Sequence, residues 1–393
     1  MNPSFALRVS FFFLFVWFGV VIPHLQLLFA ALGFNPAGVG LILGAFQLAG
    51  VAGPIALGHA ADRWGRYKPV LVVVVVVSSS ALWIASRFES IAAVMILAAV
   101  SGFFFQGAVP LTDALANATL NDPEAEYGLT RVYGSISFII TNLILQATGI
   151  IDGTSAGRIL VTVLGAGMLY LLSIPLLPAA HGSPNKPRPP ETAALREPED
   201  GPLGLSRPVV LFLLTIFLGR IGMSGYYSFF SIFLNQEIGV SVVGGYWALG
   251  AIAEIPAMFL SGKLISRFGS LRLVRFALFV MALRLGLWSV LRNPVALAGT
   301  QILHAITFGV FHVASIAFVT RHTGRKRLGI ALAAYSAVAL GVPQVLGSAI
   351  GGFVIEGLGF SGFYAVFAAL PLASGIILTR EMARWRREKY YLE

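Results

Sequence analysis

Cysteine and charge are both scarce in this chain of 393 residues. There is no cysteine, so disulfide bonds are excluded. Only 11% of the residues are charged, whereas soluble domains carry roughly 25%. Because 57% of the residues are hydrophobic, the composition excludes an ordinary soluble domain and indicates an integral membrane protein.

Motifs for enzymatic chemistry are missing as well. The chain has no Gly-x-x-x-x-Gly-Lys phosphate-binding loop, so we do not expect ATP to drive it. No clustered spacing of metal ligands occurs, and no local motif indicates a Ser/His/Asp hydrolase. We therefore expect a protein that is not an enzyme and that holds neither a metal nor an organic cofactor.

Long apolar stretches are what the chain has in abundance. About 20 apolar residues span the ~30 Å hydrocarbon core of a bilayer. Since a helix satisfies its own backbone groups in lipid, twelve such stretches predict an all-α protein with twelve transmembrane helices. The predicted spans are 7–32, 36–59, 69–86, 90–119, 128–150, 158–178, 208–235, 241–266, 271–291, 294–320, 327–355 and 361–382.

The basic residues predict the orientation of these spans. If the N-terminus is cytoplasmic, 22 of the 27 lysines and arginines fall in cytoplasmic segments and three fall in outer loops. This asymmetry follows the positive-inside rule and places both termini in the cytoplasm. The net charge of +10 therefore reflects topology and contact with anionic lipids, and we expect no nucleic-acid partner. The first apolar run is too long for a signal-peptide core, so we expect it to remain as the first span.

A polar stretch rich in proline and glycine divides the spans into two sets of six. We predict an N-terminal bundle over 1–178, a flexible cytoplasmic linker over 179–207, and a C-terminal bundle with a cytoplasmic tail over 208–393. The segment "GHAADRWGRYK" (58–68) recurs as "GKLISRFGSLR" (262–272), 204 residues later. Two pseudo-symmetric bundles of this kind are typical of secondary transporters, which hold their substrate at the midplane between the repeats.

The first copy of this repeat resembles the signature of the major facilitator superfamily between its second and third helices. The resemblance implies a cytoplasmic latch that holds the inner gate shut. The matching residues are Gly58, Asp62, Arg63, Gly65 and Arg66. In the second copy Ser266 replaces the aspartate, so that copy should contribute less. Solvated charges in a positive-inside loop are the simpler alternative.

Longer stretches resemble the phenylpropionate permease family, which is distantly similar to lactose permease. They are "VPLTDALANA" (109–118), "YGLTRVYGSISFI" (127–139), "AEIP" (253–256) and "QILHAITFGVFHVA" (301–314). The resemblance implies a proton symporter with the major facilitator fold in a bacterial inner membrane. It is specific to the family and much less so to the substrate.

One acid, Glu254, lies within an apolar run of the second half, where a lone charge would cost at least ~2.5–3.5 kcal/mol. Counting residues from the loop centres places Arg220, Arg284 and His304 at the same depth on three other helices. Burial favours the neutral acid, and a neighbouring arginine favours the carboxylate. Glu254 could therefore bind and release a proton according to its surroundings.

These four residues give our main hypothesis for the site. Glu254 would carry the proton, His304 would tune or relay it, and Arg284, Arg220 or both would attract an anionic substrate. A static ion network that holds the helices together is the alternative. His312 lies nearer the cytoplasm, where a structural hydrogen bond is at least as plausible.

The N-terminal half offers one further charged pair. Asp113 and Arg131 lie nine residues either side of residue 122, so an ion pair between adjacent helices is the natural interpretation. It could gate, bind substrate or only hold the hairpin together. Asn117, one turn after Asp113, could extend the polar face.

Several aromatic side chains are candidates for the wall of a substrate cavity, because each combines a ring with a polar atom. They are Tyr133, Tyr226, Tyr227, Trp247 and Tyr335. A belt at the lipid interface is the alternative, and it is the one that we prefer for Tyr390 and Tyr391. Glycines at four-residue spacing in "GVPQVLGSAIGG" (341–352) predict close helix packing with a hinge at Pro343.

Together these patterns predict a monomeric secondary transporter that takes up a small organic solute with protons as the coupling ion. An aromatic monocarboxylate such as a phenylpropanoid acid is the first substrate class that the resemblance suggests. A neutral sugar or nucleoside, or drug efflux by antiport, are alternatives within the class. A membrane sensor or a lipid scramblase on the same fold is the alternative outside it.

Overall fold

The structure is a computed structural model, and it describes residues 2–178, 204–324 and 327–387. Within these ranges the chain is helical, with no β-strand. Most of the predicted linker, residues 179–203, lies outside the described residues, as do Tyr390 and Tyr391.

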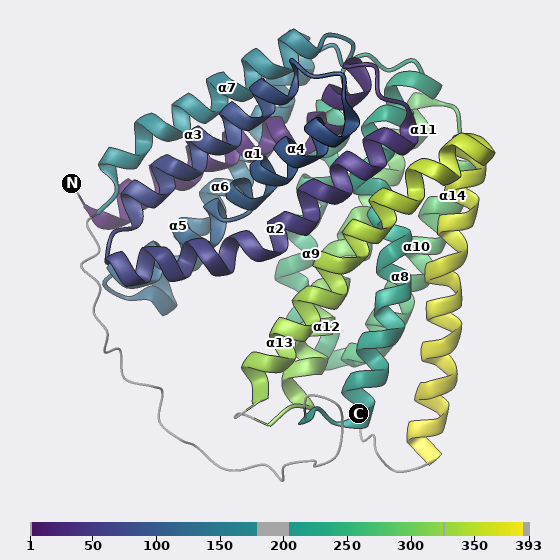
Figure 1. Cartoon of the computed structure of the whole chain (residues 1–393). Helices are drawn as coiled ribbons and strands as arrows, with labels where there is room; N and C mark the ends of the chain where they lie inside the picture. The colour runs from purple at the N-terminus through teal and green to yellow at the C-terminus, as the bar shows by residue number, and fades with distance from the viewer. Residues whose placement is uncertain (1, 179–203, 325–326, 388–393) are drawn as a thin grey trace. The chain divides into compact units, whose positions relative to one another are not determined.

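Seven helices form the first half of the chain (Figure 1). They are α1 (Pro3–Ala31), α2 (Pro36–Trp64), α3 (Tyr67–Ala85), α4 (Ile91–Phe105), α5 (Ala108–Thr119), α6 (Pro123–Thr148) and α7 (Ala156–Ser173). The span predicted over 90–119 is interrupted at Gln106 and Gly107, which separate α4 from α5. The other five spans of this half are each one helix within a few residues of the predicted bounds.

Local sequence explains where these helices begin. Pro3, Pro36 and Pro123 each occupy the first turn of a helix, where no backbone donor is needed. The residue before each proline is Asn or Asp, and its side chain accepts a backbone N–H of the first turn. These caps define the start of α1, α2 and α6.

In the second half, residues 204–324 and 327–387 form seven α-helices with short irregular segments between some of them. The helices are α8 (Arg207–Ile232), α9 (Gly244–Phe268), α10 (Ser270–Val290), α11 (Pro294–Gly299), α12 (Phe311–Arg321), α13 (Leu328–Ser336) and α14 (Val342–Arg387). A 3-10 turn, η4 (Thr300–Leu303), and a π-helical turn, η5 (Ala305–Val310), join α11 to α12. A second π-helical turn, η7 (Ala337–Gly341), joins α13 to α14.

The last apolar segment, Leu328–Arg387, has 60 residues and contains a break. At about 1.5 Å per residue a straight helix of this length would be far longer than a bilayer is thick. Gly359 has φ 65° and ψ 178°, which are non-helical values, and the ribbon of α14 turns there (Figure 1). Among the described residues, eleven helical segments are long and apolar enough to cross a membrane, and this break divides the last into two. The prediction of a twelve-helix membrane protein is thus confirmed.

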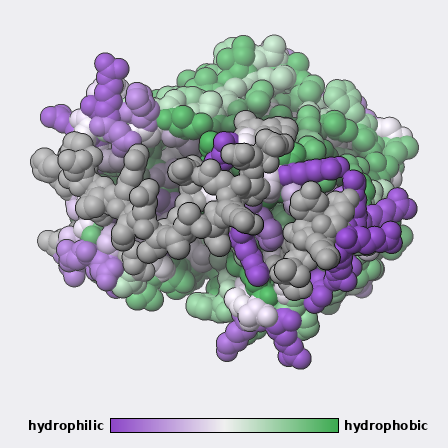
Figure 2. Space-filling model, turned by 90° about the horizontal axis from the view of Figure 1, so that it is seen from below, coloured by the Kyte–Doolittle hydropathy of each residue, from purple (hydrophilic) through white to green (hydrophobic). Residues whose placement is uncertain are grey.

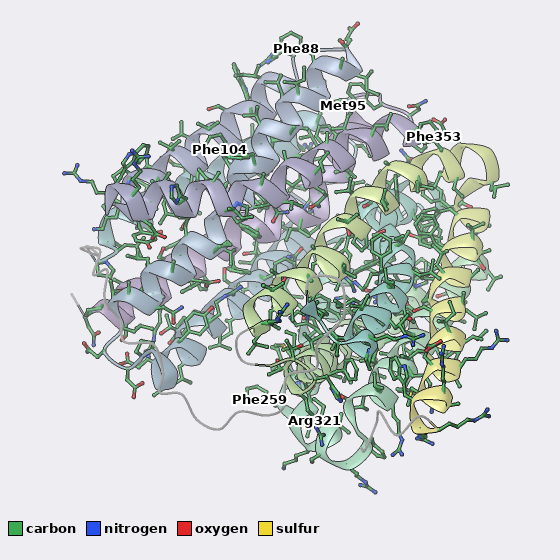
Figure 3. All side chains as sticks on the ribbon, turned by 60° about the horizontal axis from the view of Figure 1, so that its bottom comes forward. Phe88, Met95, Phe104, Phe259, Arg321 and Phe353 are labelled. Carbon is green, nitrogen blue, oxygen red and sulfur yellow. The ribbon has the colours of Figure 1, made fainter. Side chains whose placement is uncertain are left out.

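The surface agrees with a membrane environment. Phe259 on α9 is 80% exposed and Phe353 on α14 is 55% exposed, and both lie on the outside of their helices (Figure 3). In the view from below, hydrophilic groups lie around the face that is seen, and apolar groups dominate its upper part (Figure 2). Large apolar side chains are stable in such positions when lipid surrounds them.

The chain divides into two units. The first comprises Met1–Arg188 with Phe229–Ala248, and the second comprises Pro189–Ser228 with Leu249–Glu393. In the first unit, the backbone N–H of Ser231 donates to Gln26 Oε1 at 3.1 Å, and that of Gly245 donates to Gln146 Oε1 at 2.9 Å. These contacts explain why the C-terminal end of α8 and the first turn of α9 group with the first half of the chain.

Candidate functional site

Three helical segments of the second unit bring Glu254, His304 and Arg284 into one hydrogen-bonded chain. Glu254 lies on α9, Arg284 lies on α10, and His304 lies between η4 and η5. His304 Nε2 is 2.7 Å from Glu254 Oε1, and His304 Nδ1 is 2.9 Å from Arg284 Nη1. The three residues that were placed at one depth by counting are therefore in contact.

The contacts fix the tautomer of the histidine. A guanidinium can only donate hydrogen bonds, so His304 Nδ1 must accept from Arg284 and cannot carry a proton. The proton of the neutral ring is then on Nε2, which donates to the carboxylate of Glu254. In this arrangement His304 is a neutral bridge between a permanent cation and an acid.

Arg284 is the most enclosed charge in the site, with 0% of its surface exposed. Its Nη1 also donates to Thr307 Oγ1 at 3.1 Å, and its Nη2 donates to Gln301 Oε1 at 2.7 Å. The guanidinium carbon lies 4.6 Å from the ring centre of Tyr226 and 4.8 Å from that of Trp288. Among the described residues, neutral acceptors and two aromatic faces therefore hold this cation without a direct carboxylate partner.

Gln301, Thr307 and Trp288 belong to the site but were not identified from the sequence. Gln301 and Thr307 lie three residues either side of His304, a spacing that puts them on the histidine's face of a helix. Trp288 lies one turn after Arg284. Helical spacing around the two predicted charges was thus a signal that could have found all three.

The backbone around His304 departs from regular α-helix on both sides. The 3-10 turn η4 ends at Leu303, and the π-helical turn η5 begins at Ala305. Such irregular turns are frequent at functional sites because they re-aim side chains. On the facing helix, a Cβ at Gly250 would lie 3.3 Å from the His304 ring, so the small residue gives the imidazole its room.

Arg220 was placed in the same layer, but the structure gives it a different partner. Its Nε donates to the backbone carbonyl of Ala339 at 2.6 Å, and its guanidinium carbon lies 5.7 Å from the ring centre of Phe311. The residue is 5% exposed, and its Nη1 is buried without a hydrogen-bond partner among the described residues. No described carboxylate forms an ion pair with it.

The predicted aromatic residues fall into different environments. Tyr226 is 1% exposed, its ring lies against Arg284, and its hydroxyl donates to Gln301 Oε1 at 3.4 Å. The ring centre of Tyr227 lies 6.2 Å from that of His304.

Trp247 belongs to the first unit, where its indole N–H donates to Ser231 Oγ at 3.0 Å. Tyr335 contacts His312 Nδ1 through its hydroxyl at 2.8 Å, so His312 has a hydrogen bond of its own.

In the first unit, Asp113 and Arg131 form the expected ion pair between α5 and α6. Arg131 Nε lies 3.5 Å from Asp113 Oδ1, and the two side chains are 29% and 28% exposed. The guanidinium carbon of Arg131 lies 4.3 Å from the ring centre of Phe15. Asn117 donates to the backbone carbonyl of Asp113, and Tyr133 lies against Arg8 rather than Arg131.

The predicted latch sequence lies at the end of α2. Asp62 accepts a hydrogen bond from the hydroxyl of Tyr67. Gly65 ends the helix with φ 63°, a left-handed conformation in which glycine is favoured. Arg63 and Arg66 are exposed. A Cβ at Gly58 would meet nothing within 4 Å, so in this structure no neighbour requires a glycine there.

Comparison with known proteins places this architecture in a family. A family model described as the MFS_1 like family matches residues 5–366. The "Probable 3-phenylpropionic acid transporter" of Escherichia coli (strain K12) is 28% identical, over 93% of this chain and 95% of that protein. The maltose permease of Geobacillus stearothermophilus is 24% identical, over 94% of this chain and 92% of that protein.

A solved structure gives the same fold. The nucleoside transporter NupG, solved as a point mutant, aligns with a TM-score of 0.83 over 96% of this chain and 99% of that one, at 18% identity. At that identity the likeness shows the fold alone. Because the family model covers most of the chain, the protein belongs to the MFS_1 like family and is a multi-pass transporter of the major facilitator type.

Proposed function

We propose that the protein is a proton-coupled symporter that takes up a small organic monocarboxylate, with an aromatic acid such as a phenylpropanoid acid as the best candidate. The observation that carries this proposal is the hydrogen-bonded chain Arg284–His304–Glu254, in which Arg284 and His304 are buried and the Glu254 side chain is 20% exposed. It combines an acid that can change its protonation state with a cation that cannot.

Proton coupling follows from the chemistry of this chain. When Glu254 is ionised, it accepts a hydrogen bond from neutral His304 and balances the nearby positive charge. When Glu254 is protonated, that balance is lost and the site becomes more positive. A bound anion then replaces the lost negative charge, so the proton and the anion favour each other's binding.

The charge balance of the second unit favours an anionic substrate. Arg220 and Arg284 are both buried, whereas Glu254 is the one acid in contact with this network among the described residues. At least one positive charge therefore stays unbalanced within the bundle, where its cost is high. A carboxylate would neutralise it. The name of the Escherichia coli relative, a 3-phenylpropionic acid transporter, supports an aromatic acid.

Topology and location complete the proposal. The basic residues support cytoplasmic termini in a bacterial inner membrane. The sequence over 58–68 supports a cytoplasmic latch, in which Asp62, Arg63 and Arg66 would hold the inner gate shut. We propose a monomer, because two bundles within one chain are sufficient for alternating access.

A neutral sugar or nucleoside is the second candidate. It is favoured by the maltose permease among the relatives and by the structural likeness to a nucleoside transporter. In that case the two arginines would serve only the proton step and the stability of the bundle. Drug efflux by antiport would move protons in the opposite direction to the solute.

Proton movement in reconstituted liposomes separates these functions. Adding 3-phenylpropionate outside should alkalinise the external medium if the acid enters with protons. Alkalinisation on adding maltose or a nucleoside instead would favour the second candidate, and acidification of the medium by an entering solute would indicate antiport. No proton movement with any of them would contradict proton-coupled symport.

A further inference from the structure

We propose that Arg220, rather than Arg284, is the residue that binds the substrate carboxylate, and that the backbone carbonyl of Ala339 occupies it until the substrate arrives. The inference rests on the proposed function and sharpens it, because it assigns different tasks to the two buried arginines. The structure distinguishes them by their partners.

Arg284 has little capacity left for a ligand. Both of its terminal nitrogens already donate, to His304 and Thr307 from Nη1 and to Gln301 from Nη2. Only its Nε lacks a partner among the described residues, and none of its surface is exposed. A carboxylate could form the usual two-pronged contact with its terminal nitrogens only by displacing these three neighbours.

Arg220, in contrast to Arg284, has terminal nitrogens with capacity for a ligand. It makes one hydrogen bond, from Nε to the Ala339 carbonyl, and its two terminal nitrogens make none among the described residues. These are the nitrogens that a carboxylate binds with two parallel hydrogen bonds. An aromatic ring lies beside this cation, since its guanidinium carbon is 5.7 Å from the ring centre of Phe311. A phenyl carboxylate matches such surroundings.

Proline explains why the Ala339 carbonyl is available. In a regular α-helix this carbonyl would accept from the N–H of residue 343, four positions later. Residue 343 is proline and has no N–H, and the helix widens into the π-helical turn η7 at this point. Pro343 cannot donate to this carbonyl, and Arg220 Nε supplies a hydrogen bond to it.

The packing of α8 against α14 holds this pair in register. A Cβ at Gly347 would collide with Ser224, so the predicted close approach of small residues occurs here. Ser228 and Ser348 share a hydrogen bond at 2.7 Å, and Gln344 Nε2 donates to Ser228 Oγ at 2.7 Å. If a carboxylate displaced the Ala339 carbonyl from Arg220, the helix around Pro343, where a hinge is predicted, would therefore change its packing.

The test compares 3-phenylpropionate with its uncharged amide, 3-phenylpropionamide, in binding measurements on the purified full-length protein. Arg220→Gln should weaken the acid by about 10- to 100-fold, the value of a hydrogen bond to a charged group, and leave the amide unchanged. Arg220→Lys should also lower the ratio of acid to amide affinity, because lysine lacks the planar fork. Arg284→Lys tests the alternative assignment and should lower that ratio less than the Arg220 variants do, and Arg87→Gln, at an exposed residue outside the site, is the matched control that should leave it unchanged.

Pro343→Ala tests the same idea in the opposite direction and leaves Arg220 in place. The new N–H at residue 343 can bind the Ala339 carbonyl, which removes the competitor, so acid affinity should rise while amide affinity stays constant. In the Arg220→Gln background Pro343→Ala should have no such effect.

Three outcomes would overturn the inference. They are an unchanged acid-to-amide ratio in Arg220→Gln, a ratio that falls in Arg284→Lys instead, and no gain from Pro343→Ala. If the wild-type protein binds neither compound, the proposed substrate class fails and the inference fails with it. If wild type binds the acid and only the Arg220 and Pro343 results fail, the proposed function stands and Arg220 loses its assigned role.

Discussion

Each half of the chain has charged side chains on its membrane-spanning helices, but the surroundings of these side chains differ. Asp113 and Arg131 in the first unit form a balanced pair in which each side chain is nearly 30% exposed. In the second unit Arg284 is fully buried and reaches Glu254 only through a neutral histidine. The first pair neutralises itself by direct contact, whereas the second unit also buries Arg220, whose charge has no carboxylate partner among the described residues.

This difference indicates where protonation can have consequences. We expect water to reach the partly exposed ion pair of the first unit, which would limit its contribution to about 1 kcal/mol. Loss of the charge on Glu254 should have a larger effect in the second unit, because its neighbours Arg284 and His304 are buried and cannot turn to water instead. We therefore expect the second unit to contain the coupling device and the first unit to tolerate change.

The largest effect is expected from Glu254→Gln. The amide cannot take up a proton, so accumulation of 3-phenylpropionate against its gradient should stop, while exchange of labelled for unlabelled substrate continues. Uptake and counterflow in proteoliposomes measure the two activities separately. Glu89→Gln, in an exposed loop, is the matched control and should accumulate like wild type. Uphill uptake by Glu254→Gln would refute the proton role.

The second-largest effect is expected at His304, where one substitution can keep both hydrogen bonds of the ring and another can remove both. Glutamine offers one donor and one acceptor, so His304→Gln can keep both contacts of a neutral bridge, whereas His304→Leu keeps neither. Accumulation by His304→Gln should stay within about tenfold of wild type, or about 1.4 kcal/mol, and His304→Leu should lose it. Equal loss in both variants would show that the ring itself must titrate.

Substitution of Arg284 and of Arg131 should lower the free energy of unfolding by different amounts. Arg284→Gln leaves buried acceptors without a donor and should lower the free energy of unfolding by about 3 kcal/mol. Arg131→Gln removes a partly exposed pair and should cost less than about 1 kcal/mol. Thermal unfolding in detergent, read as the shift of Tm, ranks the two. A larger shift for Arg131→Gln would reverse the proposed contrast between the halves.

The smallest effect is expected from removing both charges of the first unit together. Asp113→Asn combined with Arg131→Gln should keep accumulation within about fivefold of wild type, because a half-exposed pair contributes little. Each single variant leaves one charge unpaired and should cost more than the double variant. Loss of accumulation in the double variant would make the pair part of the transport mechanism.

Much of the fold could be predicted from the sequence, because lipid imposes long apolar helices whose ends carry capping residues. The interruption between α4 and α5 was not predicted, although Pro110 lacks the N–H that would bind the carbonyl of Gln106 in a regular helix. Counting residues predicted that Glu254, His304 and Arg284 lie at one depth, because the rise per residue of a helix is constant.

Other features of the site depend on information that counting lacks. Depth says nothing of rotation about the helix axis, so the sequence could not show that Arg220 has a different partner from Glu254. That partner is the backbone carbonyl of Ala339, which becomes available only through Pro343 and the packing of α8 against α14. Side-chain spacing identifies polar neighbours such as Gln301, but it does not identify carbonyl groups freed by a proline.

The account depends on Glu254 gaining a proton when an anionic substrate binds. Difference infrared spectroscopy of the reconstituted protein at fixed pH, with and without 3-phenylpropionate, observes the acid itself. A carbonyl band of a protonated carboxylic acid should appear on binding in wild type and in Glu89→Gln, and should be absent in Glu254→Gln. The same band in Glu254→Gln, or no band in wild-type protein that binds the substrate, would contradict the account.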